Sequence, residues 1–446
     1  MRHRLPKTYV DIYRSPTFRH WFKMKAVLTG ARLLGYWNVP NQNAAASLEE
    51  ATFIDEAYCL YKNARPLMTA EDGVTEVLFQ NDSSIVRLPK GFKKNSATTI
   101  SAVGDLMPAG GLEASLDIMF EDIANVLFDA DVSFANLEAP ITEQKVEAKF
   151  VGGQTAIMGF SVSQFAALAG HRKKYFTALN FANNHTLDRG IEGIELTQKI
   201  LDEFGIVDLG TPRCPEDYGR ARVINRNGVK VGFISASYSL NGLKLSKEDS
   251  HRVHVSNLTP KHAPTDLALL RRQIADCKAQ QCDFIIASLH WGFEFEFFPR
   301  ARQVEAAHTL ANEGVDLVLG HHPHVVQPVE YYRTTRDPNR VVVIAYSLNG
   351  LGMRWYTAPH MALGLLLNLT IAKGQLNGVE QTYIEKVNTI PIFQNIFTSY
   401  NGDQRIKRIE RLDKPLVAPE SGHARRYRQE LQKYADLVLC APEDNK

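Results

Sequence analysis

The pattern of apolar and polar residues changes near residue 98 of this 446-residue chain. From there to about residue 390, short β-branched runs alternate with amphipathic segments long enough to form helices, which predicts an α/β fold. Strands are expected at residues 99–103, 132–137, 175–179, 284–289, 316–319 and 340–346, helices over about 191–204, 266–279 and 301–312, and a hairpin at 223–235 that turns at Asn227–Gly228.

The two ends of the chain have a different character. Before residue 98 we expect a helix over Leu48–Lys62, a strand pair at Glu76–Phe79 and Ser84–Leu88, and a linker over Lys90–Thr98. The apolar stretch Ala26–Trp37 is too short to span a membrane, so it predicts a helix that is buried or lies on the surface. We therefore divide the chain into an amino-terminal extension (1–97, a helix plus short strands), a central domain (98–390) and a helical carboxy-terminal appendage (391–446).

Composition and charge exclude several classes of protein. Apolar residues make up 44% and charged residues 22%, and the net charge of +2 creates no overall field for nucleic acid or an acidic membrane. Basic clusters at Met1–Lys7, Arg405–Arg411 and Arg425–Arg428 are interpreted as solvated helical faces. Five cysteines without a CxxC pair argue against a disulfide framework. No signal-peptide pattern is visible, so we expect a cytoplasmic protein with no membrane anchor and no nucleic-acid partner.

Polar side chains follow the carboxyl ends of the expected strands, where open α/β folds bind their ligands. They are Asp105, Glu138, Asn183, Asn184, His185, His290, His322 and His324. Carboxylate, amide and imidazole groups together suit one or two divalent cations, without distinguishing Mn, Zn and Fe. Taken one at a time, these residues have simpler explanations. Asp105 is explained equally by a turn or a cap, Asn183–His185 by a turn, and Asp188, nearby, by a helix cap. Glu138 alone is typical of a surface carboxylate, and His290 alone of a core histidine. Their shared location at strand ends favours a metal site.

Three histidines crowd into the run from Gly320 to His324. Because alternate residues of an extended segment point the same way, His322 and His324 are expected to face one site and His321 to point elsewhere. Pro323 stiffens the loop, and Gly320 permits a sharp turn.

With these residues in view, the chain resembles the CapA family of poly-γ-glutamate capsule synthesis proteins, which belong to the calcineurin-like metallophosphoesterase superfamily. The matching motifs are G-D-L-M at Gly104, N-L-E-A-P-I-T at Asn136, A-N-N-H-T-L-D-R-G at Ala182, S-L-H-W-G-F-E-F at Ser288, G-H-H-P-H-V-V-Q-P at Gly320 and Y-S-L-N-G at Tyr346. The resemblance covers about residues 98–390. It implies a four-layer α/β/β/α sandwich with a metal centre above the edge loops of two central sheets.

The resemblance also implies roles for individual residues. Asp105 and His324 would bind a first metal, and Glu138 would bridge both metals in place of the superfamily's usual aspartate. The second metal would be bound by Asn184, His290 and His322. His185 matches a histidine that protonates the leaving group or stabilises developing charge.

Three departures from the pattern accompany the resemblance. Met107 stands where the superfamily usually has a histidine, and a thioether is a poor ligand for hard or borderline cations. CapA-type proteins share this change. Asn349–Gly350 replaces the usual Gly-Asn order in a loop that packs beside the site. CapA proteins often carry an amino-terminal membrane anchor, which is not visible here.

This set of residues predicts a metal-dependent hydrolase, phosphoesterase-like or amidohydrolase-like, in which a metal-bound hydroxide is the nucleophile and His185 a general acid. The expected partner is an anionic small-molecule or peptide-like substrate, phosphorylated or related to poly-γ-glutamate. The alternative is a non-catalytic assembly or binding protein for capsule polymer biosynthesis, which Met107 favours. The amino-terminal extension is interpreted as a cover of the crevice or as a contact within a homo-oligomer. Glu294–Phe298 either lines a substrate channel or packs on the core.

Overall fold

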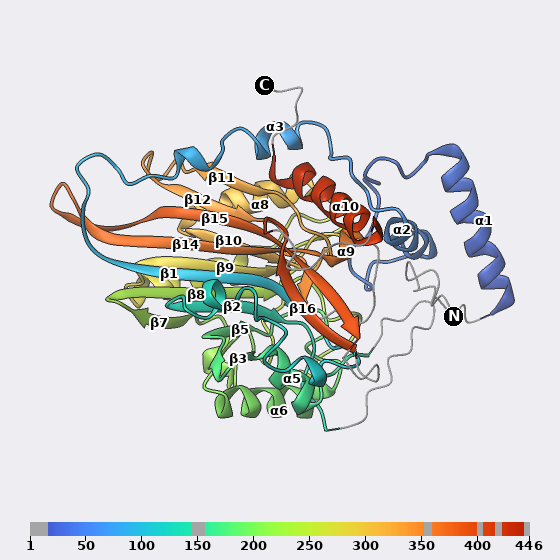
Figure 1. Ribbon diagram of the computed structural model, residues 1–446, viewed down its shortest axis with the longest axis horizontal. Helices are drawn as coiled ribbons and strands as arrows, with labels where there is room; N and C mark the ends of the chain where they lie inside the picture. Colours follow the sequence, from blue (N-terminus) through green and yellow to red (C-terminus); the bar gives the residue numbers. More distant parts are fainter. Residues whose placement is uncertain (1–16, 144–156, 352–358, 399–404, 415–421, 441–446) are drawn as a thin grey trace.

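Two β-sheets pack face to face with helices outside them, so the fold is the expected four-layer α/β/β/α sandwich (Figure 1). The computed structural model describes residues 17–143, 157–351, 359–398, 405–414 and 422–440. Within them, one sheet has the order β16-β15-β14-β1-β2-β5-β6, with β13 beside β1, and the other has the order β11-β12-β10-β9-β8-β7. Strands β1, β2, β5 and β6 are parallel, as are β8, β9, β10 and β12.

The strands of the first sheet are β1 (Lys93–Leu106), β2 (Val132–Leu137), β5 (Ala178–Asn180), β6 (Val207–Leu209), β13 (Gly350–Leu351), β14 (Leu363–Leu376), β15 (Val379–Thr398) and β16 (Arg405–Arg411). Those of the second are β7 (Arg222–Arg226), β8 (Val229–Ser237), β9 (Phe284–His290), β10 (Leu317–His321), β11 (Val329–Arg333) and β12 (Val341–Ala345). A small separate sheet pairs β3 (Gly170–His171) with β4 (Lys174–Tyr175).

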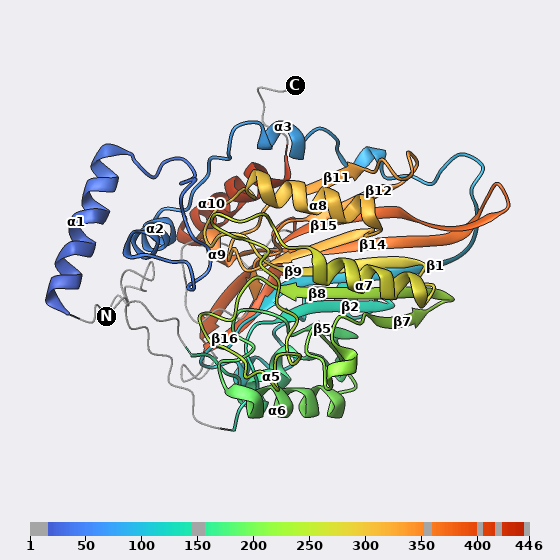
Figure 2. The same cartoon turned by 180° about the vertical axis from the view of Figure 1, so that it is seen from behind.

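The helices are α1 (Phe18–Leu34), α2 (Phe53–Ala64), α3 (Val74–Leu78), α4 (Ala124–Leu127), α5 (Val162–Leu168), α6 (Gly190–Glu203), α7 (Ala268–Ala279), α8 (Ala301–Glu313), α9 (Pro359–Ala362) and α10 (Gly422–Leu439). Short 3-10 turns occur at Ser83–Ile85, Glu113–Ser115 and Pro215–Asp217. Helices α7 and α8 lie outside the second sheet, and α5 and α6 lie on the side of the first (Figure 2).

Strand β2 shows how the sequence builds these layers. All its residues are buried, as expected for a strand covered on both faces. Phe134 points between the sheets and stacks on Phe233 of β8, with 5.8 Å between the ring centroids. Its neighbours Ala135 and Leu137 instead join the apolar cluster that includes Ile194 of α6. The period of two along a strand therefore supplies both the core between the sheets and the core beneath the helices.

The amino-terminal extension differs from expectation in its secondary structure. The strand pair predicted at Glu76–Phe79 and Ser84–Leu88 is wrong, because α3 and a 3-10 turn occupy these segments. Val74 and Leu78, one helical turn apart, are buried in the main core. The linker predicted over Lys90–Thr98 is also wrong in part: β1 begins at Lys93, where its polar residues are exposed and pair with β14.

The carboxy-terminal residues are not the helical appendage that we expected. Strand β15 continues to Thr398 and pairs with β16, so residues 405–411 form a strand and not a solvated helical face. Helix α10 does occur, but Leu431, Ala435 and Val438 on it are buried in the main core. The boundaries at residues 98 and 390 stay a prediction, and the basic cluster at Met1–Lys7 lies outside the described residues.

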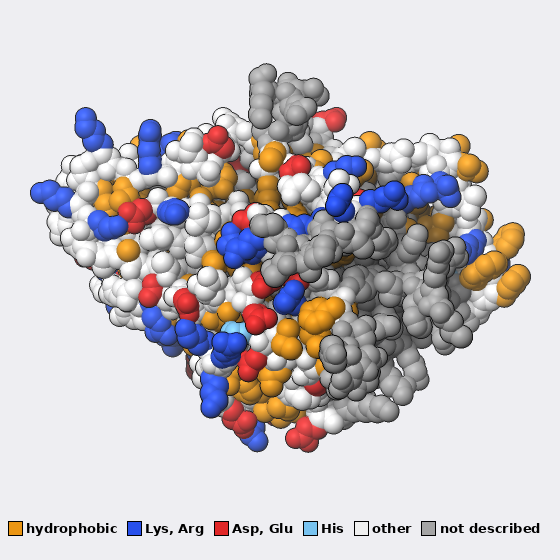
Figure 3. All heavy atoms as spheres, in the orientation of Figure 1, with side chains coloured by type: hydrophobic (Ala, Val, Ile, Leu, Met, Phe, Trp, Pro, Cys, Tyr) orange, Lys and Arg blue, Asp and Glu red, His pale blue; other side chains and the backbone are white. Residues whose placement is uncertain are grey.

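The surface carries both signs of charge. Figure 3 shows basic and acidic side chains interspersed over one face of the molecule. Helix α1 presents Phe18, Phe22 and Leu33 to solvent, and its carboxyl end is capped by Gly35 in the left-handed conformation. No helix within the described ranges is long and apolar enough to cross a membrane.

Candidate metal centre

The polar residues predicted at strand ends gather at one edge of the two sheets. Asp105 lies near the end of β1, and Glu138 follows β2; the register of these parallel strands pairs Asp105 with Asn136. His290 ends β9 beside His321 of β10, in the other sheet. The carboxyl ends of parallel strands share an edge, so the fold itself brings these side chains together.

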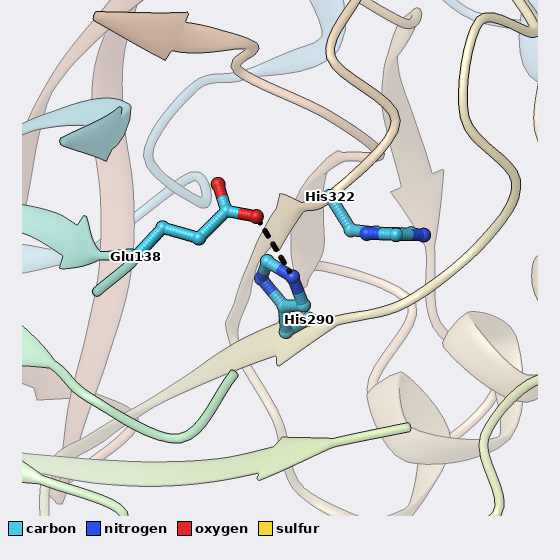
Figure 4. A group of neighbouring side chains, drawn as sticks. All are labelled: Glu138, His290 and His322. Carbon is cyan, nitrogen blue, oxygen red and sulfur yellow. Dashed lines mark ion pairs between the residues drawn. The ribbon is translucent and has the colours of Figure 1, made fainter. Parts of the chain in front are cut away.

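Glu138 is the central side chain of this group. It is fully buried, and neither carboxylate oxygen has a hydrogen-bond partner within the described residues. Its Oε1 lies 3.5 Å from His290 Nε2 and 3.7 Å from His324 Nε2. Figure 4 shows the carboxylate directed at His290, with His322 alongside. A buried carboxylate without partners is costly, so this position fits a bound cation.

Two donor groups share Glu138. The first contains Asp105, Glu138 and His324, and the second contains Glu138, His290 and His322; within each, one ligand atom per residue lies within 4.8 Å of the others. Asn184 belongs with the second group, because its Oδ1 lies 2.9 Å from His290 Nε2. We use "first half" and "second half" of the centre for these two groups.

The electrostatics of the carboxylates are those of a cation site. Burial, followed by the negative charge of Asp105, raises the pKa of Glu138 well above its usual range. Burial alone would also raise the pKa of Asp105, but the hydrogen bond and charge of His321 and the nearby histidines lower it overall. The Asp105 carboxylate is thus stabilised as an anion, whereas Glu138 lacks a compensating positive charge among the described residues.

The imidazoles are suited to be neutral ligands. Burial lowers the pKa of His290, His322 and His324 below the ordinary value for histidine. The Nδ1 atoms of His322 and His324 are buried and have no hydrogen-bond partner within the described part of the chain. A neutral imidazole nitrogen is the form that binds a metal.

The expectation that His321 points away from the centre is wrong. Its Nδ1 lies 3.1 Å from Asp105 Oδ1, and the ring is fully buried. The alternation argument fails because His322 and His324 both have positive φ angles, of 96° and 53°, so the segment is not extended. Such backbone conformations are costly for a residue with a side chain and concentrate at functional sites.

Gly320 has a different role from the turn that we expected. It lies inside β10, where an added Cβ would stand only 1.8 Å from the carbonyl oxygen of Tyr346. Gly104 is required in the same way, since its Cβ would meet the carbonyl oxygen of Asn349 at 1.5 Å. Both motif glycines therefore permit close approach of the loops that border the centre.

The residues of the Asn183–His185 run have different roles. Asn183 holds the loop, since its amide donates to the Leu137 carbonyl at 2.7 Å and its Oδ1 accepts from the His185 amide. Asn184 and His185 turn toward the centre. Asp188 is not the helix cap that we expected: its Oδ2 lies 2.7 Å from His185 Nδ1, and α6 has no side-chain cap.

The departures from the family pattern have visible structural consequences. Met107 is buried in a small apolar cluster with Phe295 and Met361, so the first half lacks a donor on that side. Asn349 adopts a left-handed conformation with φ of 61°, which asparagine tolerates better than most residues. Its carbonyl accepts a hydrogen bond of 2.8 Å from the Asp105 amide, so the loop still supports the centre.

Sequence reasoning missed several residues around the centre. Asn136 donates to Asp105 Oδ1 at 2.8 Å and stands two residues before Glu138, so the period of a strand could have indicated it. The Oδ1 of Asn241 accepts from Asn184 at 3.1 Å, and its amide nitrogen lies 3.5 Å from His185 Nε2. Tyr238 packs on His322, with 4.6 Å between ring centroids. No sequence signal points to Asn241 or Tyr238.

Fold and site together define a mixed-sheet α/β/β/α sandwich with a cluster of N and O donors at its strand ends. Residues 99–350, more than half of the chain, match the model of the bacterial capsule synthesis protein family PGA_cap. The chain therefore belongs to this family, which confirms the family indicated by the sequence motifs.

Curated relatives carry related names. The chain is 28% identical over 263 residues to the PGA biosynthesis protein CapA of Bacillus subtilis, and 26% identical over 256 residues to the capsule biosynthesis protein CapA of Bacillus anthracis. These matches cover 56% and 55% of this chain and only 61% and 59% of those proteins. A Mycobacterium tuberculosis relative, 29% identical over 46% of this chain and 52% of its own length, is named a probable polyglutamine synthesis accessory protein.

Solved structures with a similar arrangement include two at low sequence identity. The calcineurin-like phosphoesterase YfkN of Bacillus subtilis is 14% identical, with a TM-score of 0.39 over 77% of this chain and 99% of that chain. The NAD nucleotidase of Haemophilus influenzae is 12% identical, with a TM-score of 0.39 over 79% of this chain and 59% of that chain.

Proposed function

We propose that this chain is a metal-dependent hydrolase that acts on an anionic substrate in the biosynthesis or turnover of a γ-glutamyl polymer. The observation that carries the proposal is the fully buried Glu138 carboxylate, which is faced by neutral imidazoles and has no hydrogen-bond partner among the residues that the structure describes. A carboxylate can remain there as an anion only with a compensating cation.

The residues that would hold divalent cations are Asp105, Glu138, Asn184, His290, His322 and His324. Oxygen and imidazole donors without thiolates suit Mn, Zn or Fe. Such a cation would polarise the bond under attack and activate water near neutral pH.

His185 and Asp188 supply the proton chemistry. The Asp188 carboxylate, 2.7 Å from Nδ1 of His185, holds the proton on that nitrogen and leaves Nε2 to face the centre. With Nδ1 engaged by Asp188, Nε2 is the ring nitrogen through which a proton would pass to a leaving group. Asn241, whose amide lies 3.5 Å from Nε2, fixes the ring from the other side.

The substrate class is proposed from the site and the relatives together. Phosphoester and amide hydrolysis both develop negative charge on oxygen, so this set of residues serves either reaction. The relatives named for PGA or polyglutamine synthesis favour a γ-glutamyl amide, and the calcineurin-like fold favours a phosphoester.

The test is hydrolysis by purified chain loaded with Mn²⁺ or Zn²⁺, using bis(p-nitrophenyl) phosphate and a γ-glutamyl oligopeptide as substrates. His185→Gln should keep the parent metal content while the rate falls by about 10²–10⁴-fold, since it removes only the proton donor. Asp188→Asn should retain metal and lose less activity. Glu305→Gln, at an exposed position on α8, is the matched control. Absence of turnover of both substrates by fully loaded parent protein would contradict the hydrolase.

A binding or assembly role is the second candidate, because one observation favours it. Met107 is buried in an apolar cluster where a ligand is usual in the superfamily, so the first half has a reduced donor set. In that case the loaded chain would bind γ-glutamyl polymer with a measurable Kd and leave it uncleaved, and His185→Gln would not change this affinity.

A further inference from the structure

Glu294 belongs to none of the donor positions assigned so far, yet its side chain borders the centre. Its Oε1 lies 4.0 Å from His324 Nε2, and ligand atoms of Glu294, His322 and His324 all lie within 4.8 Å of one another. Donors of one cation stand about 3–4 Å apart when each bond is about 2.0–2.2 Å long. A small rotation of this partly exposed side chain is enough to reach that spacing.

Glu294 also lies on the side where the first half lacks a ligand. Phe295, the next residue, packs against Met107 in the small apolar cluster that Cys59 contacts. Cys59, which packs against this cluster, also donates to the Glu294 carboxylate, so the carboxylate is linked to the cluster that contains Met107. Its negative charge is also among the influences that raise the pKa of Glu138, after burial and Asp105.

The amino-terminal extension fixes Glu294 through a thiol. Cys59 on α2 donates from Sγ to Glu294 Oε2 at 2.9 Å, so Oε1 is the oxygen left toward His324. Burial and the charge of Glu294 raise the pKa of Cys59 well above its usual value. The thiol stays protonated and remains a donor to the carboxylate.

The backbone around Glu294 is hydrogen-bonded both to the amino-terminal extension and to the loop that carries His322 and His324. Phe295 donates its amide to the Pro323 carbonyl at 2.8 Å, and its own carbonyl accepts from Leu67 at 3.0 Å. Two residues further on, buried Glu296 pairs with Lys62 of α2 at 2.6 Å and with Arg300 at 2.7 Å. Buried pairs of this kind are strongly destabilised when one partner is removed, so they hold the segment in place.

We propose that Glu294 is a metal ligand of the first half, taking the place of the missing histidine, and that the amino-terminal extension positions it through Cys59. The inference rests on the proposed function for the presence of a metal. It makes the extension, which lies outside the family match of residues 99–350, a part of the wall of the centre.

The test is titration of the chelator-treated full chain with Mn²⁺ or Zn²⁺ by calorimetry, with elemental analysis and the absorption spectrum of a Co²⁺-loaded sample. Glu294→Gln should weaken one of the two binding events by at least the roughly 10–100-fold that removal of a group supporting a ligand costs. It should also change the Co²⁺ spectrum, because a donor atom is lost. Glu305→Gln should behave as the parent.

Two further variants separate ligation from packing. Cys59→Ala should weaken the same event, while Cys59→Ser, which keeps a donor, should restore it. Met107→His should rescue the Glu294→Gln chain, with a larger gain in affinity than it produces in the parent chain.

The role of Glu294 would be overturned if Glu294→Gln bound metal like the parent and gave the same Co²⁺ spectrum, while Glu138→Gln clearly lost metal affinity. This result would not contradict the metal-dependent hydrolase. Absence of binding by the parent itself would overturn both.

Discussion

The two halves of the candidate metal centre are built differently. The second half combines Glu138 with His290, the last residue of β9, and with Asn184 and His322, which follow β5 and β10. The first half has only Asp105 and His324 beside the shared Glu138, and its remaining side is closed by Met107 and by residues that contact the amino-terminal extension. One half is thus supplied by the sheets alone, and the other depends on a neighbouring segment.

This difference separates donors that the sheets hold from donors that a loop holds. Strand ends hold their side chains through the hydrogen-bonded sheet, so the donors of the second half are placed by the fold. A position such as Met107 is followed by loop residues and can exchange a ligand for an apolar contact. In the proposed arrangement, the extension would then position another donor, Glu294, beside the centre.

The largest expected effect comes from removing the shared ligand. Glu138→Gln should weaken metal binding in both halves by more than about 100-fold, which exceeds the effect of groups that only support a ligand. The same change should raise the stability of metal-free protein, because it removes a buried negative charge beside Asp105. Metal titration and denaturant unfolding with EDTA measure the two effects. Parent-like affinity would show that the halves do not share Glu138.

The next largest effect on metal binding is expected when a histidine of one half alone is removed. His290→Ala should abolish one binding event and preserve the other, and His324→Ala should do the reverse, since the two histidines belong to different donor groups. Elemental analysis of each variant should give about one metal fewer than the parent. Loss of all metal in both variants would mean that the two sites bind only together.

Met107→His should complete the first half with a moderate gain. We expect affinity to rise by about tenfold, or about 1.4 kcal/mol. Without metal the variant should be less stable by about 1–3 kcal/mol, because a polar ring replaces a thioether in an apolar cluster. Calorimetric titration and unfolding with and without Mn²⁺ test this pair of opposite changes. An affinity equal to the parent would indicate that Glu294 already saturates the position.

The smallest effect on the centre is expected for a buried histidine elsewhere. Burial, assisted by the charge of Arg222, lowers the pKa of His254 to about 4, and its Nε2 accepts from the Gly219 amide. The unfolded chain, with a histidine pKa of about 6.5, binds the proton first as pH falls. His254 therefore contributes stability above about pH 6.5, and this is lost as pH falls toward 4, by about 3 kcal/mol in all.

His254→Gln should flatten this part of the stability curve and leave metal binding unchanged. Urea unfolding at several pH values between about 7 and 4, compared with the parent, measures the slope. An unchanged slope would assign the acid sensitivity to other groups, and a loss of metal would show that His254 is coupled to the centre.

Much of the central sandwich could be predicted from the sequence, but less of the segments before and after it. Strand β2 and the hairpin at Asn227–Gly228 agree with expectation because their alternation and turn chemistry are local. The E-V-L-F run at Glu76 was assigned to a strand and lies largely in a helix, since short apolar runs do not distinguish the two. Packing of Val74 and Leu78 on the core decided it.

The same division applies to the centre. Polar residues after apolar runs were enough to locate Asp105, Glu138 and His290 at one edge of the sheets. Alternation does not hold at His321, because His322 and His324 have positive φ angles and the segment is therefore not extended. The position of Asp188 at the start of the D-R-G-I-E-G-I-E segment predicts a cap, whereas its contact with His185 is visible only in the structure.

The α/β pattern, the family and the residue types at the strand ends can all be predicted from the amino-acid sequence, because each depends on local periodicity or on motif order. Three features are visible only in the folded chain. Glu138 is buried and has no hydrogen-bond partner in the described segments, His321 lies beside Asp105, and Cys59 contacts Glu294 across 235 positions of the chain. Those contacts join segments distant in sequence, and their burial depends on the packing of the whole molecule.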